Sequence, residues 1–207
     1  KLELEGQSLT AEGFLTGIGG PGMGLETEGT IRNLNPAVWP LDNMAAWDGD
    51  INADFSLVGK NLDTPERQGR LNVQLMTSGL AGYRIDKGSF DLTAANGTLV
   101  VSEAHLTGPG GSARIEGRLE GINETAAGLK TVIRGEIRNF ATDTLFPDLK
   151  MGGMINIDLQ ADAYKRPGAS APFDPAGWAG NAELRLHPSV ILETAVSGGK
   201  LQAGWNG

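Results

Sequence analysis

Residues 28–54 read EGTIRNLNPAVWPLDNMAAWDGDINAD, and residues 134–158 read RGEIRNFATDTLFPDLKMGGMINID. Both stretches contain G-x-I-R-N and a large apolar residue, then an aromatic residue followed by proline, and finally G-x-I-N-x-D. The similarity continues upstream, where residues 11–17 (AEGFLTG) align with residues 115–121 (IEGRLEG). An internal repeat of this kind decides the architecture of a chain, so we organise the prediction around it.

Two copies of a unit of about 100 residues account for the chain. We predict a first unit at residues 1–103 and a second, truncated unit at residues 104–207 that continues directly from the first. One long loop is expected at residues 166–177, because three prolines among small residues cannot form a central strand. We also expect the chain to be part of a longer protein.

The composition excludes several classes of protein. Of the 207 residues, 40% are hydrophobic, which is typical of neither a disordered nor a membrane chain, and no apolar run approaches the ~20 residues that cross a bilayer. The net charge is −8 and the 17 basic residues are scattered, whereas a nucleic-acid-binding surface needs a cluster of them. Because cysteine is absent, disulfides and thiolate metal sites are excluded.

Alternation of apolar and polar residues dominates the chain. It is clearest at residues 70–75, 113–121 and 155–163, and each of these predicts a strand with one apolar and one solvated face. Glycine-rich turn signals separate such stretches. Asn96-Gly97 predicts a type I′ hairpin turn, since both residues tolerate positive φ.

Helix is expected only as short turns. Asn35 and Pro36 predict an N-cap and the first position of a turn over residues 36–39, with a second short turn at 41–47. The second copy carries the same feature from Thr142 or Asp143 to Phe146. A proline follows each turn and prevents a longer helix.

Strands that each bury one face, without helices to cover them, define an all-β fold. The apolar faces must meet a second sheet, close into a barrel, or line a curled trough, and the residues alone leave sandwich and trough open. A repeat of short meandering strands favours an elongated, curled antiparallel sheet that grows by adding strands, as solenoids grow.

No catalytic or metal-binding motif is found. His105 and His187 lie in different segments and are predicted to be solvated strand histidines. The G-x-G-x-x-G at residues 17–22 contains proline and precedes a strand pattern, so it predicts a hairpin loop and not a phosphate site. The DGDINAD at residues 48–54 begins like a calcium loop but lacks the loop's glycine and bidentate glutamate. We therefore expect no enzyme activity and no metal.

The pattern resembles a known family. IRNLNPAVWP, GDINADFSLVG and the strands that end in GGSARIEGRLEG are similar to the repeating unit of the AsmA-like superfamily of Gram-negative envelope proteins, and most similar to its TamB (translocation and assembly module) family. The resemblance covers nearly the whole chain and rests on glycine and leucine spacing.

The resemblance implies a U-shaped β-groove (a "β-taco") in the periplasm, with the inner-membrane anchor outside this stretch. It implies that phospholipid acyl chains move along an apolar groove between the inner and outer membranes, in support of outer-membrane biogenesis. It also implies an outer-membrane barrel protein of the TamA type as partner. Apart from bound phospholipid or detergent, no cofactor is expected.

We expect the groove to be lined by apolar residues on alternating strand positions, although the same residues would also suit a packed core. These residues are Leu25, Ile31, Ile51, Phe55, Leu71, Val73, Leu92, Ile115, Leu119, Ile133, Ile137, Ile155, Ile157, Leu159, Leu184 and Leu186. Trp39 and Phe146, at the helical turns of the repeat, are predicted to plug the edge or interior of the sheet.

Two other functions remain open. A scaffold or chaperone could receive strands of outer-membrane proteins at an open sheet edge, next to a barrel partner. A repetitive adhesin is the third alternative, although the usual Asn or Thr ladders are missing.

Overall fold

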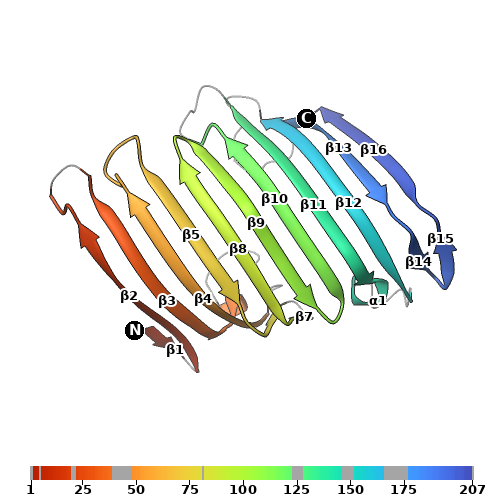
Figure 1. The fold of residues 1–207 in the computed structure, drawn as a ribbon, viewed down its shortest axis with the longest axis horizontal. Coiled ribbons are helices and arrows are strands. Elements are labelled where there is room, and N and C mark those ends of the chain that lie inside the picture. The colour runs from red at the N-terminus through yellow and green to blue at the C-terminus, as the bar shows by residue number, and fades with distance from the viewer. Residues whose placement is uncertain are drawn as a thin grey trace. The chain divides into compact units, whose positions relative to one another are not determined.

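The computed structural model describes residues 2–4, 6–19, 22–38, 48–80, 82–122, 128–145, 152–165 and 177–206. Trp39, Phe146, the turn predicted at 41–47 and all of the predicted loop 166–177 except Gly177 lie outside these residues. The described residues form sixteen strands, one 3₁₀ turn and one four-residue helix (Figure 1). The predicted all-β antiparallel meander with a short helical turn in each repeat is confirmed.

The chain divides into two compact units, the first being Lys1–Ala95 with Glu103–Gly110. Its main strands pair antiparallel in the order β1-β2-β3-β4-β5-β8, and a side hairpin, β6–β7, pairs with β4. The elements are β1 (Leu2–Leu4), β2 (Gln7–Thr16), β3 (Gly24–Leu34), η1 (Pro36–Val38), β4 (Gly49–Lys60), β5 (Gln68–Leu75), β6 (Ser78–Leu80), β7 (Tyr83–Ile85) and β8 (Lys87–Ala95).

The second unit is Asn96–Ser102 with Gly111–Gly207, and it repeats this plan. Its strands pair in the order β10-β11-β12-β13-β16, and the side hairpin β14–β15 pairs with β12. The elements are β10 (Gly111–Glu120), β11 (Leu129–Ala141), α1 (Thr142–Leu145), β12 (Gly153–Lys165), β13 (Trp178–Leu186), β14 (Ser189–Ile191), β15 (Thr194–Val196) and β16 (Gly199–Asn206). Strand β9 (Thr98–Gly108) contributes residues to both units.

A β-bulge marks the repeated I-R-N motif in each unit. Asn33 (φ 53°) and Asn139 (φ 51°) are the extra residues, in the left-handed conformation that asparagine tolerates better than most side chains. The Asn33 N–H donates to Asn52 Oδ1 at 2.9 Å, and the Asn139 N–H donates to Asn156 Oδ1 at 2.8 Å. The identical residues of the two copies therefore make the same backbone irregularity.

The hydrogen bonds around the bulge continue to the side hairpin. The Asn52 N–H donates to Ser78 Oγ at 2.9 Å, and the Asn156 N–H donates to Ser189 Oγ at 3.0 Å. Both serines are buried, at 3% and 7% exposure. We call Asn33, Asn52 and Ser78, with their counterparts Asn139, Asn156 and Ser189, the bulge network, and each unit contains a complete set.

Two local predictions are confirmed. Asn96 (φ 51°) and Gly97 (φ 72°) both adopt the positive φ of a type I′ turn. The Asn35 Oδ1 accepts a hydrogen bond from the Ala37 N–H at 2.9 Å, which caps η1 as predicted. In the second unit the turn begins at Thr142.

The described side chains do not form a deep core. Ala53 is the one buried hydrophobic residue among them, and no large side chain in the described ranges is fully buried. The apolar side chains are instead half buried, which is what a single layer of sheet gives and what a sandwich core does not.

Candidate functional site

The first unit collects its apolar side chains on one face of the sheet. The antiparallel register aligns alternate residues of neighbouring strands, as in the cross-strand row Gly29, Phe55, Val73 and Phe90. All seven lining residues predicted in this unit share this face. The face comprises Leu9, Leu15, Leu25, Ile31, Ile51, Phe55, Leu57, Leu71, Val73, Leu75, Phe90 and Leu92.

The second unit has an equivalent apolar face. One row runs through Ile115, Gly135, Leu159, Leu184 and Leu201. The nine lining residues predicted here share the face, which comprises Ile115, Leu119, Ile133, Ile137, Ile155, Ile157, Leu159, Leu184, Leu186, Leu201 and Trp205.

Several residues of these faces were not among those predicted. Leu57 and Phe90 belong to the first face, and Leu201 and Trp205 to the second. The same alternation of apolar and polar residues marks these positions, so the signal that would have found them is present in the sequence.

Both faces are open to solvent at the side-chain level. None of the sixteen predicted lining residues is buried, and Ile115 among them is 48% exposed. Leu201, which was not predicted but lies on the same face, is 63% exposed. Exposed apolar surface that continues over several strands exceeds the scattered apolar residues of an ordinary surface. This accessibility is what a surface that binds an apolar ligand requires.

Glycines on both faces lie under aromatic rings. A Cβ at Gly29 would come within 2.7 Å of Phe55 Cζ, and a Cβ at Gly180 within 2.7 Å of Trp205 Cζ2. Each ring therefore occupies the space above its cross-strand glycine. At these two points the aromatic ring fills the space that the glycine, which has no side chain, leaves in the apolar surface.

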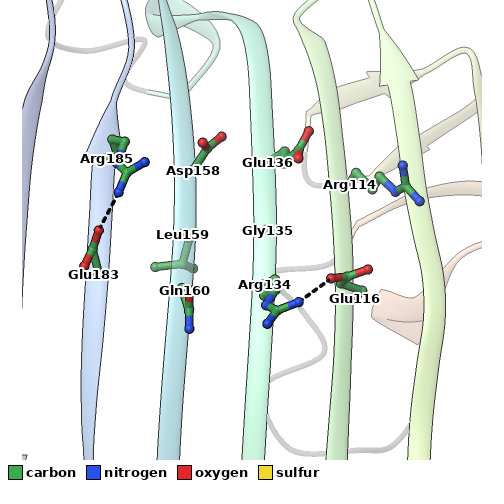
Figure 2. Close-up of a pocket in the computed structure, with 10 residues that line it drawn as sticks. All are labelled: Arg114, Glu116, Arg134, Gly135, Glu136, Asp158, Leu159, Gln160, Glu183 and Arg185. Atoms are coloured by element: carbon green, nitrogen blue, oxygen red, sulfur yellow. Dashed lines mark hydrogen bonds and ion pairs between the residues drawn. The ribbon is translucent and has the colours of Figure 1, made fainter.

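The opposite face of the second unit is polar and carries both signs of charge. Figure 2 shows two cross-strand rows, with Arg114, Glu136, Asp158 and Arg185 in one row and Glu116, Arg134, Gln160 and Glu183 in the next. Arg134 pairs with Glu116 at 3.6 Å, and Arg185 with Glu183 at 3.1 Å. These side chains border an open pocket of about 340 Å³. Three arginines and four carboxylates line this pocket, so it mixes charges of both signs.

His187 is the histidine that departs from prediction. It follows β13 rather than lying in a strand, and its Nε2 is 2.6 Å from Asp158 Oδ2. Arg138 donates to the other oxygen, Asp158 Oδ1, at 2.5 Å. The hydrogen bond with His187, and then that with Arg138, lowers the pKa of Asp158. The strand placement predicted for His187 was wrong, although its side chain is solvated at 38% exposure. The contact with Asp158 was not predicted because it joins residues that are distant in sequence.

Comparisons with protein families, curated proteins and solved structures find no match to this chain. The resemblance to AsmA-like proteins therefore stays a prediction. Within the described ranges, no helix has the length and apolar character to cross a membrane, and no cluster of His, Asp and Glu is arranged to hold a metal ion.

Proposed function

We propose that this chain is a lipid-binding segment whose apolar sheet faces carry the acyl chains of phospholipid. The observation that carries the proposal is the apolar face of each unit, whose large side chains remain half exposed. The parent protein would be a periplasmic bridge between the inner and outer membranes that supports outer-membrane biogenesis.

The chemistry of the faces favours passive transport. Moving a methylene group from water onto apolar surface contributes roughly 0.8 kcal/mol to the binding free energy when the group is fully buried. Binding of an acyl chain to the face is therefore favourable. Leucine, isoleucine, alanine and glycine make up most of each row, and Thr27, Thr131 and Lys165 are among the polar exceptions. Successive positions of an acyl chain would therefore have similar energies, which lets it slide.

The second unit offers a matched test on one strand. Ile133 lies on the apolar face at 38% exposure, and its neighbour Val132 lies on the polar face at 44% exposure. We expect Ile133→Asn to lower the phospholipid recovered in organic extracts of the purified protein about fivefold, because it places an amide on the acyl-binding surface. Val132→Asn should leave the recovery unchanged.

Mass spectrometry of the extracts, with circular dichroism to confirm folding, measures this difference. Equal lipid from both variants would contradict the proposal. So would the absence of lipid from the folded unmodified protein.

A scaffold is the second function that we propose, with β16 as the strand that receives a partner. Strand β16 pairs with β13 alone among the described strands, and all eight of its residues, Gly199–Asn206, are exposed. An exposed edge strand presents backbone N–H and C=O groups that an incoming strand can pair with. In this alternative, the edge receives a strand of an outer-membrane protein, next to a barrel partner of the TamA type.

A further inference from the structure

One cation breaks the apolar pattern of the second unit. Lys165 is the last residue of β12, and the alternation that places Leu159, Ala161 and Ala163 on the apolar face places Lys165 there too. The residue is 5% exposed, although lysine is almost never this buried unless it is paired.

Lys165 has no electrostatic partner within the described part of the chain. No ion pair or side-chain hydrogen bond joins it to another described residue. No side-chain nitrogen or oxygen in the described ranges is both sealed from solvent and without a partner, so Nζ itself still reaches the surface. The aliphatic stem is therefore covered while the ammonium group remains available to an incoming anion.

The neighbours of Lys165 are amphipathic or apolar. Its cross-strand partners are Leu129 on β11 and Trp178 on β13, and one row further in, Trp205 faces Gly180. Tryptophan and lysine together are characteristic of the level at which an apolar medium meets water. The apolar residues of β12 then extend from Ala163 to Ile155, a distance of roughly 27 Å along the strand.

The described residues of the first unit include no such cation. The repeat aligns Asn61 with Lys165, and Asn61 is a turn residue with φ 53°. The nearby Lys60 is exposed, and its position on β4 belongs to the polar face. The buried lysine is therefore a property of the second unit and not of the repeated scaffold.

We propose that Lys165 binds the anionic headgroup, phosphate or carboxylate, of an amphiphile whose acyl chain lies on the apolar face of the second unit. This inference rests on the proposed lipid-binding function and specifies its ligand class. The ammonium group reaches the surface at the end of the apolar face, where it can form a charge-assisted hydrogen bond with an anion. The headgroup would be fixed at the end of β12 and the acyl chain directed along the strand.

The test compares two detergents with the same dodecyl chain, dodecyl phosphate and the uncharged dodecyl maltoside, by isothermal titration calorimetry below their micelle concentrations. We expect the unmodified protein to bind dodecyl phosphate about tenfold more tightly. Lys165→Met should abolish this preference while dodecyl maltoside still binds, and Lys165→Arg should retain it. Lys130→Met is the matched control, because Lys130 is an exposed lysine on the polar face of β11.

Each outcome has a separate meaning. If neither detergent binds the folded protein, the proposed function fails together with this inference. If both bind equally, or if Lys165→Met keeps the preference, the headgroup assignment alone is wrong. If inorganic phosphate binds as tightly as dodecyl phosphate, Lys165 belongs to a site for free anions, which also overturns the assignment to a lipid.

Discussion

At the scale of single residues, Asp158 is a carboxylate that two side chains from other parts of the second unit hold in place. Its pKa is lowered by the hydrogen bond with His187 and then by that with Arg138. A carboxylate with a lowered pKa in the folded state stabilises the fold above its unfolded pKa of about 3.9, and this contribution is lost as the pH falls through the folded value. The second unit should therefore lose stability on acidification below about pH 4.

His187→Met tests this assignment, because methionine is the residue that the first unit has at the equivalent Met76. We expect the carboxyl of Asp158 to titrate at higher pH in the variant, since the larger cause of the lowered pKa is removed. The change in the free energy of unfolding should be small, about 0.2–1 kcal/mol, because the pair is partly exposed.

Carbon-detected NMR follows the carboxyl directly, and urea unfolding at pH 7 and pH 3 gives the energy. An unchanged titration of Asp158 in His187→Met would show that Arg138 alone sets its pKa.

The sequence predicts residues well where only alternation matters. Ile133, Leu159 and Leu184 lie on the predicted face because a strand has a period of two, whichever strands it pairs with. The contact of His187 with Asp158 and the surroundings of Lys165 were not predicted. Both depend on the register between strands, which the alternation within one strand does not give.

At the scale of elements, Ser78 and Ser189 attach the side hairpins to β4 and β12. The Ser78 hydroxyl accepts from the Asn52 N–H at 2.9 Å and donates to the Met76 carbonyl oxygen at 2.9 Å. We expect Ser78→Ala to lower the free energy of unfolding by about 1–3 kcal/mol, because it leaves a backbone donor without its partner in a buried place.

Hydrogen exchange at the Asn52 amide is the sharper measurement, since protection there should fall together with stability. Ser56→Ala is the control, because Ser56 lies exposed on the same strand. If the Asn52 amide keeps its protection in Ser78→Ala, then the serine does not anchor the hairpin.

The side hairpins were not predicted. Strands of three residues, such as β6 (Ser78–Leu80) and β14 (Ser189–Ile191), are too short to show alternation, and their pairing with β4 and β12 is a contact across the sequence. The Asn35 cap and the Asn96-Gly97 turn were predictable because each is decided by its own residues.

At the scale of the whole chain, the edge of β16 tests the proposed scaffold function. If β16 receives strands, then a synthetic peptide with the strand sequence of an outer-membrane barrel protein should shift the amide NMR resonances of Gly199–Asn206. The resonances of β12 should not move, because β11 and β13 already occupy both of its edges.

The same peptide, N-methylated at alternate residues, is the control, since it lacks the donors for a new ladder. Resonances of β16 that do not respond to the unmodified peptide would contradict the scaffold function. That result would not contradict the proposed lipid binding.

The boundary between the two units was harder to predict from the sequence than the repeat. Strand β9 contributes Thr98–Ser102 to one unit and Glu103–Gly108 to the other, and a continuous strand gives no local signal at such a boundary. The repeat itself is visible because Gly29 to Asn33 recurs as Gly135 to Asn139.

The bulge network has a consequence for how such a chain can change over generations. Because each unit closes its own set of hydrogen bonds, duplicating a unit duplicates everything that its irregular backbone needs. The side chains outside the network are then free to diverge between the copies, as Met76 and His187 have, and Asn61 and Lys165. A newly added copy can acquire a chemistry of its own while its sibling keeps the original surface.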